Sequence, residues 1–155
     1  MNINLKGKIA LVTGSTAGIG LAIAQGMHKA GASVILNGRS EERLIQAVNK
    51  FDCLDRVFTV AADVGTKEGC ELIDKNFPDI DILVNNAGIF SPKPIFEISD
   101  DEWLNYFNIN VLSGIRLARS YIPLMIGKRW GRVVLSVIAS SYIINCFYCI
   151  YFEYI

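Results

Sequence analysis

Short, continuously apolar runs alternate with segments of helical periodicity along most of the chain, and this alternation constrains the fold more than any other feature. The expected strands cover residues 8–13, 33–37, 57–61, 80–84 and 132–135, and the expected helices cover residues 19–30, 40–50, 66–77 and 99–127. Strands that are apolar throughout are buried on both faces, and strands joined through helices run parallel. The pattern therefore predicts an α/β fold with a doubly wound parallel sheet.

The expected helix ends carry residues that are typical of helix starts and stops. Gly31 follows the first helix and Pro78 follows the third. Ser40 stands at the cap position of the second helix, and residues 99–102 read Ser-Asp-Asp-Glu, the capping-box pattern. Local capping signals and apolar periodicity thus predict the same helix boundaries.

A glycine-rich loop, Thr13–Gly20, joins the first strand to the first helix. Glycines at this junction permit a tight turn and let backbone N–H groups approach a pyrophosphate at the helix N-terminus, where the dipole favours negative charge. A glycine-rich turn alone is weak evidence, but the first strand–helix junction is where a dinucleotide site needs it. The loop predicts a dinucleotide-binding site.

Four ordered motifs resemble the short-chain dehydrogenase/reductase family. They are the spacing of Gly14, Gly18 and Gly20, the sequence Asn-Asn-Ala-Gly at residues 85–88, the Asp63–Val64 pair, and Asn110 on the long helix. The resemblance covers residues 6 to about 134. It implies a Rossmann-type sheet, incomplete at its C-terminal side, and an oxidoreductase that uses NAD(P) to reduce a small carbonyl compound or oxidise an alcohol.

The resemblance also implies which residues hold the cofactor and which form of it is preferred. In place of the acidic residue that NAD-dependent members carry after the second strand, the chain has Gly38, followed by Arg39. An arginine can bind a phosphate through two N–H groups, so NADP is expected to be preferred, with NAD possible. The alternative is that Arg39 is an ordinary solvent-exposed residue with no role in cofactor binding. The expected cofactor-binding residues are Gly14, Ser15, Thr16, Gly18, Ile19, Gly20, Arg39, Asp63, Val64, Asn86, Ala87 and Gly88.

The catalytic residues that the resemblance implies are largely missing. Family members use a tyrosine and a lysine four residues later as the acid couple, and no Tyr-x-x-x-Lys occurs in these 155 residues. Asn110 matches the family's active-site asparagine, and Ser136 is a weaker candidate for the serine on the fifth strand. We therefore expect catalysis to be absent or nearly so. A non-catalytic nucleotide-binding module and a non-functional fragment are the alternatives.

The last twenty-odd residues differ in composition from the rest. Glu153 is the only charged residue after Arg132, and four of the six tyrosines follow Ser141. We expect residues 1–134 to form the NAD(P)-binding domain and residues 135–155 to be an atypical apolar tail from a truncated or frameshifted gene. A rival interpretation is a membrane span over residues 133–152, which carry no charge and follow basic residues.

Composition excludes several other classes of function. Lys and Arg number 15 and Asp and Glu number 15, so no electrostatic attraction to nucleic acid is expected. The four cysteines are too few for a disulfide framework, and the Cys146/Cys149 pair lacks the second ligand pair of a metal site. We expect that the chain binds no metal ion and that the protein is located in the cytoplasm. The family often forms homo-oligomers through the long helix, although pairing is doubtful without the helix that follows.

Overall fold

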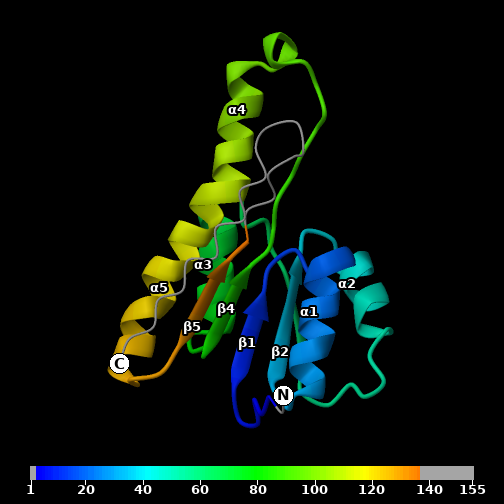
Figure 1. Cartoon of the computed structure of the whole chain (residues 1–155), viewed down its shortest axis with the longest axis vertical. Helices are drawn as coiled ribbons and strands as arrows, with labels where there is room; N and C mark the ends of the chain where they lie inside the picture. Colours follow the sequence, from blue (N-terminus) through cyan, green and yellow to red (C-terminus); the bar gives the residue numbers. More distant parts are fainter. Residues whose placement is uncertain (1–2, 137–155) are drawn as a thin grey trace.

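The computed structural model describes residues 3–136 (Figure 1). Five strands and their connecting helices alternate as the apolar pattern predicts. The strands are β1 (Ile9–Val12), β2 (Ser33–Gly38), β3 (Val57–Ala61), β4 (Ile82–Asn85) and β5 (Arg132–Leu135). The helices are α1 (Gly18–Lys29), α2 (Glu41–Val48), α3 (Lys67–Asn76), α4 (Asp100–Phe107) and α5 (Ser113–Gly127), with a 3-10 turn η1 (Ile95–Glu97) and a π-helical turn η2 (Asn108–Leu112).

All five strands are parallel and lie in the order β3-β2-β1-β4-β5. The order reverses between β1 and β4, which is where ligands bind in open sheets of this kind. Within the described residues β5 is an edge strand. The doubly wound Rossmann-type fold is therefore confirmed.

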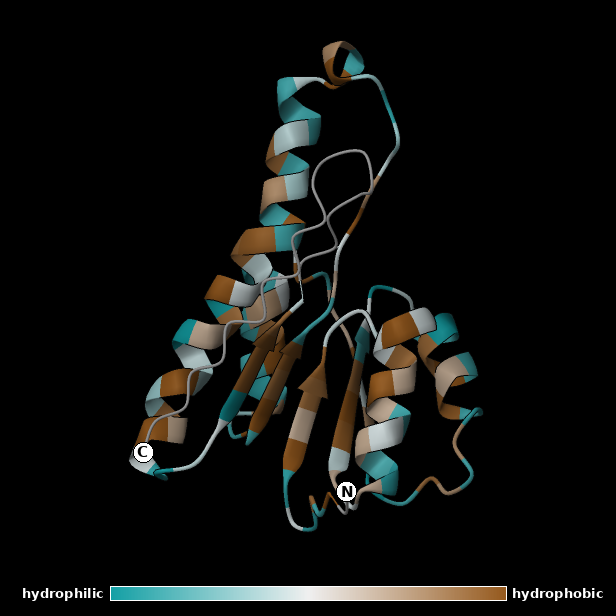
Figure 2. Ribbon diagram, in the orientation of Figure 1, coloured by the Kyte–Doolittle hydropathy of each residue, from teal (hydrophilic) through white to brown (hydrophobic). Residues whose placement is uncertain are grey.

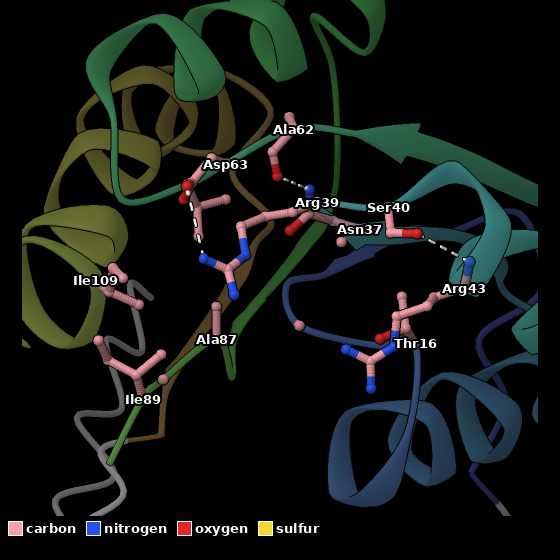
Figure 3. A pocket seen from close by; sticks show the side chains of 14 residues that line it. Thr16, Asn37, Arg39, Ser40, Arg43, Ala62, Asp63, Ala87, Ile89 and Ile109 are labelled. Carbon is pink, nitrogen blue, oxygen red and sulfur yellow. Dashed lines mark hydrogen bonds and ion pairs between the residues drawn. The ribbon is translucent and has the colours of Figure 1, made fainter. Parts of the chain in front are cut away.

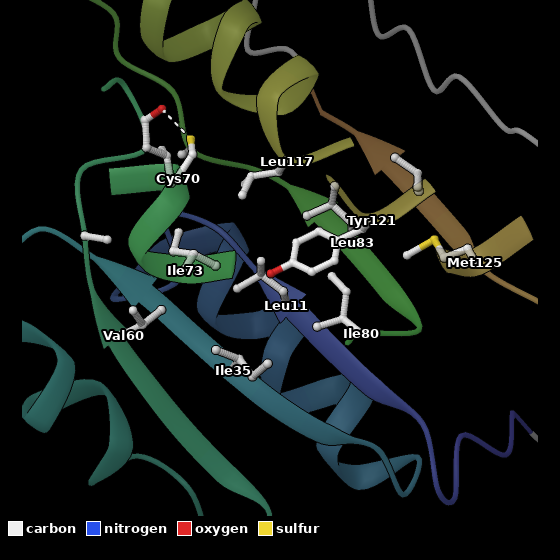
Figure 4. Packing of buried hydrophobic residues seen from close by; sticks show 14 residues of the cluster. Leu11, Ile35, Val60, Cys70, Ile73, Ile80, Leu83, Leu117, Tyr121 and Met125 are labelled. Carbon is white, nitrogen blue, oxygen red and sulfur yellow. Dashed lines mark hydrogen bonds between the residues drawn. The ribbon is translucent and has the colours of Figure 1, made fainter. Parts of the chain in front are cut away.

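Two apolar layers cover the two faces of the sheet. Leu11, Ile35 and Leu83 point toward α3 and α5, where the fully buried ring of Tyr121 lies over them (Figure 4). Their strand neighbours, such as Val12 and Leu36, point the other way and pack against α1 and α2. Figure 2 shows the apolar residues concentrated in the strands. Burial on both faces explains why the strand sequences show no polar alternation.

The predicted helix caps are present. Ser40 accepts a hydrogen bond from the backbone N–H of Arg43. Thr66, which was not predicted as a cap, accepts one from Gly69 at the start of α3. Ser99 and Glu102 form the complete capping box of α4. These side chains satisfy N–H groups that have no partner inside their own helix.

The long helical region ends at Gly127, as predicted, but it is not one uniform helix. The π-helical turn η2 separates α4 from α5. Figure 1 shows α4 extending beyond the sheet, and α4 has no buried residue. The sequence signals for η2 are weak, because residues 108–112 also fit ordinary helical periodicity.

Candidate functional site

The glycine-rich loop needs its glycines for geometric reasons. Gly14 and Gly18 have φ angles of +62° and +58°, a region that disfavours residues with a Cβ. A Cβ on Gly14 would lie 2.8 Å from the Cα of Ala87, and one on Gly20 would lie 2.6 Å from the carbonyl oxygen of Gly14. The loop thus packs closely against α1 and against the segment after β4, leaving its backbone accessible at the N-terminus of α1.

Thr13 joins the loop to the segment after β4. Its buried Oγ1 accepts hydrogen bonds from the backbone N–H groups of Asn86 and Ala87, at 3.0 and 2.9 Å, and donates to Oδ1 of Asn85. In return, Nδ2 of Asn86 donates to the carbonyl oxygens of Thr13 and Gly14. Two motifs about 70 residues apart therefore form one rigid unit at the carboxyl ends of β1 and β4.

A cavity of about 310 Å³ opens beside this unit, at the carboxyl ends of β1, β2, β3 and β4 (Figure 3). Seven of the residues predicted to bind the cofactor line it, namely Gly14, Thr16, Arg39, Asp63, Val64, Ala87 and Gly88. Its other walls are formed by Asn37, Gly38, Ser40, Arg43, Ala62, Ile89 and Ile109. The sequence motifs thus converge on one hollow.

The remaining predicted cofactor residues lie around the cavity rather than in its wall. Ser15 is fully buried, donates to the carbonyl oxygen of Val12 and accepts from the backbone N–H of Asn37, so it links the ends of β1 and β2. Ile19 is exposed at the start of α1. Gly18 lies beside it, Gly20 leaves room for the carbonyl oxygen of Gly14, and Asn86 fixes the loop through its side-chain hydrogen bonds.

Arg39 reaches across the cavity. Its guanidinium group lies 4.0 Å from the Asp63 carboxylate (Figure 3), and both side chains are substantially exposed. Asp63 also accepts a hydrogen bond from the backbone N–H of Gly65, which fixes the turn after β3. The exposed ion pair is weak, so Arg39 is free to exchange this partner for another anion.

Several residues of the cavity were not identified from the sequence, and two of them are polar or charged. Asn37 is buried and donates through Nδ2 to the carbonyl oxygens of Val60 and Ala62, fastening β2 to β3 at the floor of the cavity. Arg43 lies in the first turn of α2 and points toward Thr16. Its position three residues after the Ser40 cap is the signal that could have placed it on the side of the cavity.

Asn110 lies in the π-helical turn η2. Its Oδ1 accepts from the backbone N–H of Ile89 at 2.8 Å, and its Nδ2 donates to the carbonyl oxygen of Ile89 at 3.0 Å. The side chain therefore holds the segment after β4 against the long helical region. Ser136 continues the pairing of β5, because its backbone N–H donates to the carbonyl oxygen of Asn85.

Neither tyrosine of the described residues lines the cavity. Burial against the sheet raises the pKa of Tyr121 above its usual range, and its hydroxyl group donates to the carbonyl oxygen of Phe77 in the core. Tyr106 is on α4, next to Trp103. Between residues 3 and 136, then, no tyrosine occupies the position of an acid at the cavity.

The described residues hold no cluster of His, Cys, Asp and Glu that could bind a metal ion. Among the same residues, no helix is both long and apolar enough to span a membrane. Most of the candidate span over residues 133–152, and both members of the Cys146/Cys149 pair, lie outside the described part of the chain. Of the four residues of that span inside it, 133–135 are in β5 and Ser136 follows the strand.

A parallel doubly wound sheet with a glycine-rich loop and a cavity at its switch point defines a nucleotide-binding domain of the Rossmann type. The family model of the short chain dehydrogenases matches residues 8–149. The chain therefore belongs to the short-chain dehydrogenase family. The match extends past residue 134, and a domain boundary at that position stays a prediction.

Relatives that are similar in sequence support this membership. The uncharacterized oxidoreductase YvaG of Bacillus subtilis is 48% identical over 137 residues, which are 86% of this chain and 52% of the relative. The 3-oxoacyl-[acyl-carrier-protein] reductase FabG of Haemophilus influenzae is 39% identical over 134 residues, covering 84% of this chain and 54% of the reductase. The chain spans about half the length of the curated relatives it matches.

Among solved structures, the L-sorbose reductase of Gluconobacter frateurii, complexed with NADPH and L-sorbose, superposes with a TM-score of 0.77 at 40% identity. The match covers 86% of this chain and 53% of the reductase. Family membership makes the chain a relative of oxidoreductases, one of which is described in complex with NADPH.

Proposed function

We propose that this chain binds NADP(H) in the cavity between Arg39 and the glycine-rich loop. The supporting observation is that the loop, the segment after β4 and the two arginines lie around a single cavity. Gly14 has no room for a side chain beside Ala87, and the glycines leave the loop backbone without side-chain cover, which suits a pyrophosphate. The residues present therefore fit a nicotinamide dinucleotide.

Each part of the cavity has a proposed role. The backbone of Gly14–Gly20 holds the pyrophosphate, with Ser15 and Ile19 in the same loop. Asp63 and Val64 contact the adenine, and Asn86, Ala87 and Gly88 form the wall that continues toward the nicotinamide. Arg39 and Arg43 bind the 2′-phosphate, because charge-assisted hydrogen bonds from guanidinium groups suit a phosphate. This arrangement favours NADP over NAD.

The bound nicotinamide supplies or accepts the hydride in the reaction of this family, on a small carbonyl compound or secondary alcohol. The chain's own contribution to that chemistry is small. Asn110 positions the Ile89 backbone, Ser136 is a candidate for orienting a substrate oxygen, and no Tyr-x-x-x-Lys is present. We propose that the 155 residues alone transfer hydride several orders of magnitude more slowly than a complete relative.

A turnover assay tests this part of the proposal. Purified chain is incubated with NADPH and a panel of small carbonyl compounds, and NADPH oxidation is followed by absorbance, with a full-length relative as the positive control. Binding without turnover supports a nucleotide-binding module, and insoluble protein supports the alternative of a non-functional fragment. Turnover at a rate close to that of the relative contradicts the proposed loss of catalysis.

A further inference from the structure

Gly38, the last residue of β2, faces Thr16 across the rim of the cavity. A Cβ on Gly38 would lie 2.5 Å from the Thr16 methyl carbon, Cγ2, but 3.7 Å from Cβ and 3.8 Å from Oγ1 of the same threonine. Gly38 is not among the residues with a positive φ angle. The φ angle at this position therefore does not disfavour a side chain, and the nearest obstacle is one methyl group.

The obstacle cannot be removed by a small adjustment. Carbon atoms in van der Waals contact lie about 3.5–4.0 Å apart, so the methyl group must rotate away. Threonine is branched at Cβ and has restricted χ1 rotation, and leaving a favoured rotamer costs free energy. A side chain at residue 38 is thus accommodated only when Thr16 gives up its present conformation.

We propose that the Thr16 methyl group is a determinant of cofactor specificity, because it occupies the space that a side chain at the end of β2 would need. This inference rests on the proposed function. An acidic side chain at this position would accept hydrogen bonds from the two hydroxyl groups of an unphosphorylated ribose and repel a 2′-phosphate. With the methyl group in place, the end of β2 stays open to the phosphate and its two arginines.

The proposal makes the two positions interdependent. Gly38→Asp alone weakens NADP binding by charge repulsion, yet gains little affinity for NAD because the new side chain competes with the methyl group. Thr16→Ser removes only that methyl group and keeps the hydroxyl. We therefore expect Gly38→Asp to improve NAD binding about three- to tenfold more in the Thr16→Ser background than in the parent.

A stability measurement tests the contact without any cofactor. Gly38→Ala introduces only the Cβ, and at a permissive φ angle this change normally stabilises a protein by restricting the unfolded chain. We expect Gly38→Ala to lower the urea midpoint in the parent and to raise it in the Thr16→Ser background. Equal shifts in the two backgrounds would overturn the steric contact.

The binding experiment uses calorimetric titration of NADP and NAD into the parent, each single variant and the double variant. Thr59→Ser, which removes an exposed threonine methyl group on β3, is the matched control and should not couple to Gly38→Asp. Additive effects of Thr16→Ser and Gly38→Asp on the ratio of NAD to NADP affinity overturn the specificity role. If the parent binds neither cofactor, the proposed function fails, while the urea experiment still decides whether the contact exists.

Discussion

Arg39 and Arg43 face the same cavity, but their surroundings differ. Arg39 is paired with Asp63 at 4.0 Å, whereas within residues 3–136 Arg43 has no carboxylate partner. Arg43 is therefore available to an incoming phosphate without breaking an existing ion pair. Arg39 must leave Asp63, or be shared between that carboxylate and the phosphate. The two arginines should contribute unequally to cofactor binding.

Replacing either arginine by methionine keeps much of its volume and removes its charge. We expect Arg39→Met and Arg43→Met each to weaken NADPH binding about tenfold or more, since hydrogen bonds to charged groups are the strong ones, and to leave NADH binding nearly unchanged. Calorimetric titration measures both affinities. Arg119→Met, on the exposed surface of α5, is the control for a general loss of positive charge. An equal loss for NADH would show that the arginines do not contact the 2′-phosphate.

Cys70 is a buried thiol of α3 whose Sγ donates to the carbonyl oxygen of Val64. Burial raises the pKa of this thiol from 9.0 to about 11. The native state thus holds the proton more tightly than the unfolded state. Its contribution to stability is complete below pH 9.0 and is lost as the pH rises toward about 11.

The urea midpoint should therefore fall between pH 9.0 and about 11, and Cys70→Ala should make this fall less steep. Other groups also titrate in this range, so the informative quantity is the difference in slope between parent and variant. Cys53→Ala, which removes an exposed thiol, is the matched control variant. Identical slopes for parent and Cys70→Ala would contradict a contribution of the buried Cys70 thiol to the pH dependence of stability.

At the scale of elements, α4 depends on its cap more than the other helices do. No residue of α4 is buried, so packing contributes little to its stability. The side chain of Ser99 accepts from the backbone N–H of Glu102 at 3.3 Å, and Glu102 accepts from the backbone N–H of Ser99 at 3.2 Å. These reciprocal bonds hold the first turn of the helix.

Ser99→Ala should destabilise α4 by about 1 kcal/mol, the usual value of such a cap. Hydrogen exchange at the backbone amides of residues 102–107 should become faster while the strands keep their protection. Thr66→Ala removes the corresponding cap of α3 and should affect the amides of α3 instead. Unchanged exchange in α4 after Ser99→Ala would mean that contacts other than the cap maintain this helix.

The elements that could be predicted from the sequence are those set by local signals. The strand over residues 57–61 and the Ser99 capping box were predicted at the residues where they occur. The turn η2 was not, because its π-helical geometry comes with the Asn110 contact to Ile89 after β4, a tertiary interaction. The spacing of Arg43 from the Ser40 cap indicates its side of α2, but its place at the cavity also depends on how α2 packs against β2.

At the scale of the whole molecule, the described residues include all the elements that surround the cavity. The glycine-rich loop, the segment after β4 and the ends of β2 and β3 surround the cavity, and the chain spans about half the length of its curated relatives. The proposed nucleotide binding therefore depends on contacts within residues 3–136. The proposed loss of catalysis depends instead on a residue pair that the sequence does not contain.

The central claim is that this chain binds a 2′-phosphorylated nicotinamide dinucleotide. Parallel calorimetric titrations of the purified chain with NADPH and NADH test it most directly. We predict saturable binding of NADPH at one site per chain, with an affinity about tenfold or more above that for NADH, as expected for arginine contacts to one additional phosphate. No saturable binding of either dinucleotide, or equal affinity for both, would contradict the claim.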